Sequence, residues 1–213
     1  MRQISEDEMM GNKEVYIELV NSIEREGFDK QRLIEMLNST DFFYAPASAK
    51  YHLACKGGLC QHSLNVYKNL KNLVNNSPLK DTVSEDTIKI ISLFHDFAKI
   101  NCYTTTVQNK KVYCESGSKH DQMGRFDWVS VPGYARLEDS ERFIYGNHEE
   151  TSEYIVRCYV PLTVEESCCI LYHHGGMSYD SVKADVSPIY CRYPIACLLH
   201  LADMMATYIN ENE

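Results

Sequence analysis

Apolar side chains recur at helical spacing along most of the chain, and this pattern predicts a largely helical protein. Residues 12–26 form the first such segment, which ends near Gly27, and Asp29 is placed to cap a second short helix. We expect residues 1–40 to form a helical extension that packs on the core. Residues 41–213 would then make a single globular unit.

Five further segments predict helices with stronger apolar faces. Residues 59–75 follow a glycine pair, and a second segment begins at Ser84 and is apolar nearly all round, which is typical of a helix in the middle of a core. Three more helices are expected downstream: one beginning near residue 148, one over residues 163–173 with a capping box, and one over residues 195–209.

Between residues 101 and 135 the helical period is lost. Residues 103–107 and 112–114 have strand-like composition, and the polar residues 109–111 between them predict a turn, which together indicate a short β-hairpin. Glycines and a proline predict that the rest of this insertion, around Trp128, is irregular. The expected fold class is therefore all-α: a helical bundle with a small β-hairpin and irregular insertion.

Composition and charge narrow the classes of function. The chain is 44% hydrophobic and 24% charged, its N-terminus is polar, and no apolar run approaches a membrane span. These features predict a cytoplasmic protein without a membrane partner, whose nine cysteines are mostly buried free thiols. The net charge of −9 disfavours binding to duplex nucleic acid. A small phosphorylated substrate stays open because bound cations can reverse the potential of a pocket, and a homo-oligomer is compatible with the sequence.

The most informative chemistry is an adjacent histidine and aspartate, His95 and Asp96, at the end of the most apolar segment. Burying an imidazole and a carboxylate together is costly unless they are paired or bind a cation. The pair alone is a weak signal, but four other predicted helices each contribute one further candidate ligand flanked by apolar sequence. These ligands are His62, His148, His173 and Asp203. Convergence of one ligand per helix is how helical bundles build metal sites.

This ordered set resembles the H…HD…H…H…D signature of the HD superfamily of metal-dependent hydrolases. The resemblance covers residues 41–209 and includes the glycine pair before His62, the lysine three places after Asp96 and the segment from Leu198 to Asp203. The chain looks most like small, largely uncharacterised bacterial and phage HD proteins. More distantly it resembles the HD half of a bacterial 3′–5′ exoribonuclease.

The resemblance implies one or two divalent metal ions. A first ion would be held by His62, His95, Asp96 and Asp203. A second would be held by the shared Asp96 with His148 and His173. The family uses manganese, iron, cobalt or nickel and sometimes magnesium, and the imidazole-rich set favours transition metals. His148 departs from the Gly-His-Gly arrangement of the relatives it most resembles, because the sequence here reads Gly146, Asn147, His148.

The implied activity is metal-dependent phosphate ester hydrolysis by a phosphomonoesterase or phosphodiesterase, acting on a nucleotide or short oligonucleotide. Metal ions lower the pKa of bound water from about 15.7 toward 7, and the resulting hydroxide would attack phosphorus. Asp96 and Lys99 would be the catalytic residues, with Lys99 also reaching a substrate phosphate.

Other residues near the motifs suggest roles of lower rank. His174 is a candidate substrate contact, and Trp128 could stack a nucleobase over the metals. His200 shares a helical face with Asp203 and is expected to support the site. His52 and His120 are expected in surface loops, with His52 close enough to the first motif to line the mouth of the site. Glu149 and Glu150 are candidates for acid catalysis. Two alternative functions stay open: a di-iron oxygenase of the HD type, and a catalytically inactive nucleotide-binding HD module.

Overall fold

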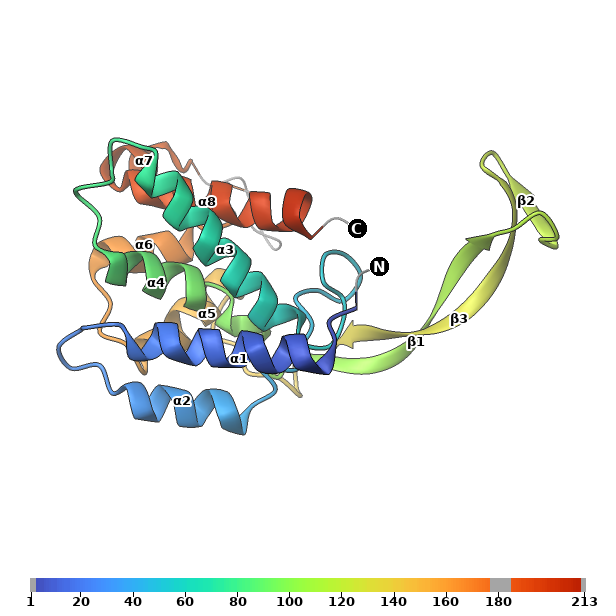
Figure 1. The fold of residues 1–213 in the computed structure, drawn as a ribbon, viewed down its shortest axis with the longest axis horizontal. Helices are drawn as coiled ribbons and strands as arrows, with labels where there is room; N and C mark the ends of the chain where they lie inside the picture. Colours follow the sequence, from blue (N-terminus) through green and yellow to red (C-terminus); the bar gives the residue numbers. More distant parts are fainter. Residues whose placement is uncertain (1–2, 177–184, 212–213) are drawn as a thin grey trace.

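The computed structural model describes residues 3–176 and 185–211, which form a helical body and a long β-arm (Figure 1). The prediction of an all-α fold class is wrong. The described residues make a mixed α/β structure with eight α-helices and a three-stranded antiparallel sheet. The helices hold the candidate site, and the sheet forms the arm.

The first two helices pack against the rest of the body and share its hydrophobic core. α1 (Glu6–Asn21) begins earlier than the apolar pattern predicts because Ser5 forms a capping box with Glu8, and α2 (Lys30–Ser39) is capped by Asp29 as expected. Tyr16 of α1 is fully buried, and its hydroxyl donates a 2.8 Å hydrogen bond to the Leu93 carbonyl.

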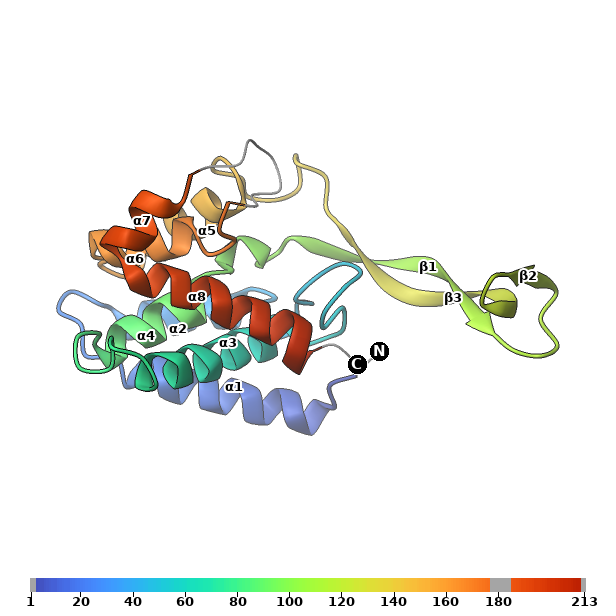
Figure 2. The same ribbon diagram turned by 90° about the horizontal axis from the view of Figure 1, so that it is seen from above.

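The middle of the body is made by α3 (Gly58–Asn75), α4 (Glu85–Phe94) and α8 (Pro194–Met205), with α3 packed against both α4 and α8 (Figures 1 and 2). Every residue of α4 from Ile88 to Phe94 is buried, which confirms the prediction that this segment lies inside the core. Its burial places the His95–Asp96 pair, which directly follows α4, deep in the molecule.

Shorter elements complete the body around these three helices. A 3₁₀ turn, η1 (Phe97–Lys99), follows Asp96, and a π-helical turn, η2 (Ala206–Asn210), follows α8. The remaining helices are α5 (His148–Arg157), α6 (Val164–Leu171) and α7 (Ser187–Arg192). The Ser152 hydroxyl of α5 accepts a 3.1 Å hydrogen bond from the Ala98 amide, so α5 fixes the 3₁₀ turn that carries Lys99.

The arm consists of β1 (Tyr103–Tyr113), β2 (Lys119–Asp121) and β3 (Gly124–Arg136) in the order β1-β3-β2, and it projects far from the body in both views (Figures 1 and 2). The predicted turn at residues 109–111 is wrong, since Asn109 continues β1 and pairs with Ser130. Aromatic and β-branched residues in β3 favour a strand that pairs along the whole of β1, so the irregular region was mispredicted.

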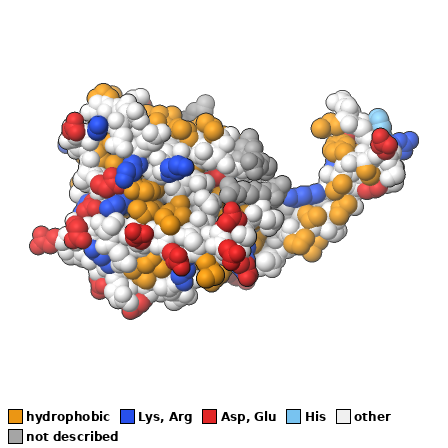
Figure 3. Space-filling view, viewed as in Figure 1, with side chains coloured by type: hydrophobic (Ala, Val, Ile, Leu, Met, Phe, Trp, Pro, Cys, Tyr) orange, Lys and Arg blue, Asp and Glu red, His pale blue; other side chains and the backbone are white. Residues whose placement is uncertain are grey.

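β3 can contain a proline because β2 pairs with only a short part of this strand. Pro132 pairs with Val107 near the root of the arm, whereas β2 covers β3 only between Gly124 and Phe126. At Pro132 the strand therefore has a free edge, where a missing amide hydrogen costs no ladder bond. Hydrophobic side chains along the arm are open to solvent, including Trp128 at 49% exposure (Figure 3).

Within the described residues, no helix is long and apolar enough to cross a membrane. All nine cysteines lie in this part of the chain and are free thiols, four of them buried: Cys55, Cys60, Cys102 and Cys169.

Candidate metal centre

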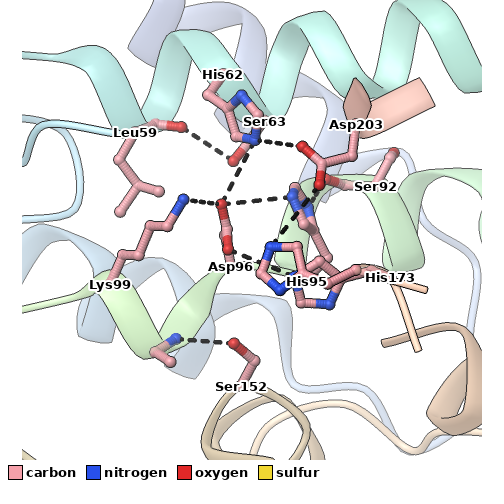
Figure 4. Close-up of polar contacts among 12 residues, drawn as sticks. Leu59, His62, Ser63, Ser92, His95, Asp96, Lys99, Ser152, His173 and Asp203 are labelled. Atoms are coloured by element: carbon pink, nitrogen blue, oxygen red, sulfur yellow. Dashed lines mark hydrogen bonds and ion pairs between the residues drawn. The ribbon is translucent and has the colours of Figure 1, made fainter. Parts of the chain in front are cut away.

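The six predicted ligands meet at one place in the body, brought there by five separate elements. Figure 4 labels His62, His95, Asp96, His173 and Asp203 among them. α3 supplies His62, α5 begins with His148, and α8 supplies Asp203. His95 and Asp96 follow the end of α4, and His173 lies two residues beyond α6. The ligand atoms fall into groups whose members lie within 4.8 Å of one another. The convergence expected from the sequence is therefore present.

Asp96 lies at the middle of this cluster, and its two carboxylate oxygens face different histidines. Oδ2 lies 3.5 Å from Nε2 of His62 and 3.5 Å from Nε2 of His95. Oδ1 lies 2.8 Å from Nε2 of His148 and 3.7 Å from Nε2 of His173. The carboxylate thus divides the histidines into the same two pairs that the resemblance assigns to two metal ions, which is the arrangement of a bridging ligand.

Asp203 lies between the two pairs. Its Oδ1 is 3.1 Å from Nε2 of His62, and its carboxylate also falls within 4.8 Å of ligand atoms of His95 and His173. The expected assignment of Asp203 to the first ion is compatible with these distances, and the same carboxylate is also close to a histidine of the second pair.

Two imidazoles are oriented by backbone carbonyls behind them. Nδ1 of His95 donates to the Ser92 carbonyl at 2.9 Å, and Nδ1 of His173 donates to the Ile170 carbonyl at 2.6 Å. Because a carbonyl only accepts, Nδ1 carries the hydrogen in both rings, and in the neutral rings Nε2 carries the lone pair. Both Nε2 atoms are buried and make no hydrogen bond to any described residue. Buried unpaired nitrogens of this kind fit a bound cation.

The electrostatics of the cluster put some of the candidate ligands in the forms that metals need, whereas neighbouring carboxylates raise the pKa values of His62 and His173. Burial lowers the pKa of His95 to about 3 and also lowers the pKa of His148, so both rings are neutral at pH 7. Burial opposes ionisation of Asp96, but the charge of Lys99 and the hydrogen bond with His148 hold its pKa well below the ordinary value. Asp96 is therefore an anion, with the Lys99 ammonium 2.7 Å from its Oδ2.

One side of the cluster is closed, and the other, called the open side below, is partly exposed. The side chains of His62, His95 and His173 are at most 1% exposed. The side chains of Lys99 and His148 are each 13% exposed, and those of His174 and Asp203 are 22% and 11% exposed. A metal site with an open side can admit a substrate, whereas structural sites are closed by protein ligands.

His174, predicted as a substrate contact, lies at this open side. Its Nε2 is 3.9 Å from Oδ2 of Asp203, and its Nδ1 is 2.7 Å from Oε1 of Glu149. Glu150 instead completes a capping box with Asn147 at the start of α5. His200 donates from Nδ1 to the His173 carbonyl at 2.7 Å, so it holds the backbone of a candidate ligand.

Trp128 is not brought to the centre. Trp128 lies in β3 and pairs with Lys111 of β1, which is eight positions from Tyr103 along that strand. This corresponds to a separation of roughly 26 Å at about 3.3 Å per residue. Tyr103 at the start of β1 is close enough to the centre for the charge of Lys99 to lower its pKa, which burial raises. His120 is exposed in β2, where the sequence predicted a loop.

Two residues near the centre were missed or underrated by the sequence. Glu211 is buried, and its carboxylate lies 3.1 Å from Nδ1 of His62. His52, expected at the surface, is half-buried with its ring centroid 5.0 Å from that of His62. Nothing in the local pattern marks Glu211, because its contact depends on how the chain turns after α8.

Comparison with protein-family profiles, curated proteins and solved structures finds no match to this chain.

Proposed function

We propose that the protein is a metal-dependent phosphohydrolase, acting on phosphate esters such as a nucleotide or short oligonucleotide. The observation that carries the proposal is the division of four histidines between the two oxygens of Asp96. A carboxylate that bridges two ions is a recurrent feature of hydrolytic sites, where the ions lie about 3.5–4 Å apart. The open side at Lys99 and His174 supports a catalytic over a purely structural centre.

The donor set supports transition metals. Four imidazoles and two carboxylates suit manganese, iron, cobalt or nickel, while magnesium prefers oxygen ligands and retains water. His62, His95, Asp96 and Asp203 would hold one ion. Asp96, His148 and His173 would hold the other, with His174 close enough to contribute a further nitrogen.

Bound ions in such a centre activate water and offset the charge that develops on phosphoryl oxygens. The protein's own part is to hold these groups and to add one fixed charge. Burial opposes the charge on Lys99, but the neighbouring Asp96 raises its pKa, so the ammonium stays protonated at the open side. There it can pair with a phosphoryl oxygen of a bound substrate. The Ser152 hydroxyl holds the 3₁₀ turn that carries Lys99 by accepting a hydrogen bond from the Ala98 amide.

The proposal is tested with purified protein stripped of metal and reloaded with Mn²⁺, Co²⁺, Ni²⁺ or Mg²⁺. Each form is assayed on p-nitrophenyl phosphate, bis-p-nitrophenyl phosphate and a panel of nucleotides. We expect turnover with a transition metal, its loss on chelation, and a decrease of about 100-fold or more in Asp96→Ala and Asp96→Asn. The exposed Asp81 gives the matched control, Asp81→Asn, which should keep wild-type turnover.

Two results would contradict the proposal. Full activity in a folded Asp96→Asn protein would remove the bridging role of this carboxylate. Tight metal binding without turnover of any phosphate ester would instead place the chain among non-hydrolytic metal proteins, and iron content with oxygen uptake would then be measured.

A further inference from the structure

A buried carboxylate from the segment after α8 lies directly behind His62. Both oxygens of Glu211 are 3.1 Å from Nδ1 of His62, although the two residues are 149 positions apart in the sequence. The Glu211 side chain is fully buried. On the other side of the ring, Nε2 of His62 faces Asp203 at 3.1 Å. The imidazole is thus held between one carboxylate of the centre and one outside it.

Glu211 is itself held in place by side chains and backbone. Its Oε1 accepts a 2.8 Å hydrogen bond from Nδ2 of Asn65, which lies one turn after His62 on α3. Its amide donates to the Ala206 carbonyl at 3.0 Å, which closes the wide π-helical turn η2. π-helical turns are rare overall, and those that do occur are often found at functional sites. Here the turn directs residue 211 back toward α3.

Hydrogen bonds extend from Glu211 to the first helix. Asn65 Oδ1 accepts from Gln61 Nε2 at 2.9 Å, and Gln61 Oε1 accepts from Asn12 Nδ2 at 2.9 Å. Asn12 lies in α1. The position of the carboxylate behind His62 is therefore supported from α1, α3 and η2, and does not depend on a single contact.

His62 differs in this respect from the other buried histidines of the centre. His95 and His173 donate from Nδ1 to uncharged backbone carbonyls, whereas His62 faces a carboxylate. An ionised acceptor behind a ligating histidine fixes the Nδ1–H tautomer, orients the ring and makes Nε2 a stronger donor to the metal. Such partners commonly change metal affinity by 10- to 100-fold.

We propose that Glu211 is a positioning residue of the metal centre, which holds His62 with Nδ1 protonated and Nε2 directed at the first ion. The proposal rests on the metal centre of the proposed function, but not on the reaction that it catalyses. In this proposal the segment after α8 is part of the site, and Asn65 holds the Glu211 carboxylate in position.

The test is metal binding by Glu211→Gln, measured without substrate. Titration of metal-free protein with Co²⁺, followed by visible absorption and calorimetry, gives the stoichiometry and Kd for each ion. We expect one of the ions to bind roughly 10- to 100-fold more weakly, with a changed absorption spectrum, and Asn65→Ala to show a smaller loss. Glu14, exposed on α1, gives the control Glu14→Gln, which should bind as the wild type does.

A second measurement separates positioning from simple stabilisation. Long-range ¹H–¹⁵N spectra of the imidazoles in the Zn²⁺-loaded protein should show His62 as the Nδ1–H tautomer in the wild type. In Glu211→Gln the Nδ1 proton should shift upfield, because the charged acceptor is gone. Glu211→Gln keeps the size of the side chain, so this variant serves where Glu211→Ala fails to fold.

The outcomes distinguish this proposal from the function. If Glu211→Gln lowers Tm but leaves every Kd and the tautomer signal unchanged, Glu211 is only structural and the proposal is overturned. An additional Co²⁺ ion that is lost in both Glu211→Gln and His52→Ala would also overturn it, by making Glu211 a ligand. A wild-type protein that binds no transition metal would overturn the centre itself, and metal binding without hydrolysis would contradict the function alone.

Discussion

At the scale of the residue, the centre combines groups that would each be unstable alone in the core. Asp96 is 2% exposed, and a lone carboxylate at that depth would lose its charge. Lys99 and the surrounding histidines compensate for it in the metal-free protein. Because Lys99 lies on the same carboxylate oxygen as His62 and His95, the ammonium competes with the first ion for Asp96.

This competition leads to opposite effects of Lys99→Gln on binding and catalysis. Removing the ammonium should strengthen binding of the first ion, since a positive charge 2.7 Å from its ligand oxygen is lost. The same change should lower kcat for p-nitrophenyl phosphate by roughly 10- to 100-fold, because a charge that stabilises the transition state is lost. Calorimetric Kd values and steady-state kinetics test both, and a parallel fall in affinity and kcat would contradict the assignment.

A second residue-scale prediction concerns protons. Burial would lower the pKa of His62, but the charge of Glu211 and hydrogen bonds to Asp203 and Glu211 raise it to about 10. At pH 7 this ring therefore carries a proton that must leave before Nε2 can bind a metal. We expect metal uptake to release about one proton from this ring. Calorimetry in buffers of different ionisation enthalpy measures the release, and His62→Gln should reduce it.

At the scale of the element, α4 and α5 were predictable because each carries its own signal. α4 is apolar nearly all round from Ile88 to Phe94, and α5 begins at a capping box of Asn147 and Glu150. The six candidate ligands could be named for the same reason, since they lie in or beside strongly patterned helices. The arm was mispredicted because its strands are stabilised by pairing across the sheet, as between Lys111 and Trp128, which local sequence does not reveal.

The arm and the centre should be separable. Lys111 and Tyr113 bond to Asp121, and Ser118 bonds to Asp127, all inside the arm. Replacing residues 109–130 by an Asn-Gly turn would keep the root pair of Gln108 and Val131 and should retain Co²⁺ affinity within about twofold, because surface loops and tips tolerate such changes. Loss of the metal site on this deletion, in a protein with wild-type helical circular dichroism, would show that the arm shapes the centre.

At the scale of the whole molecule, the buried histidines should make the metal-free protein less stable at both acidic and alkaline pH. Burial lowers the pKa of His95 to about 3. Burial is also the main reason why the pKa values of His52 and His174 are lowered to about 4. Unfolding restores values near 6.5, so the unfolded chain binds more protons in this window. The contribution of these rings is present above pH 6.5 and is lost as the pH falls toward 4.

His62 acts in the opposite direction. Its pKa is raised to about 10 in the folded protein, so its contribution is complete below pH 6.5 and is lost as the pH rises toward 10. We expect Tm of the metal-free protein to be highest near neutral pH and to fall on both sides. Differential scanning calorimetry from pH 4.5 to 9.5 measures this. His62→Gln should flatten the alkaline side, and an unchanged alkaline slope in that variant would contradict the assignment.

Metal removal gives the last whole-molecule prediction. An ion present at 100 times its Kd stabilises the folded state by about 2.7 kcal/mol, which corresponds to roughly 5–10 °C in Tm for a chain of this size. Chelation should reverse this shift in the wild type and have a much smaller effect in Asp96→Asn. Equal shifts in both proteins would place the stabilising ion elsewhere.

The packing of α8 against α3 has a consequence for how the protein matures. His62 is made early during synthesis, while Asp203 follows 141 positions later and Glu211 later still. A nascent chain that has left the ribosome only as far as α6 holds three of the four candidate ligand histidines but lacks the carboxylates that bracket His62. In the proposed centre, metal binding at His62 is therefore expected only after α8 and the segment that follows it have been made.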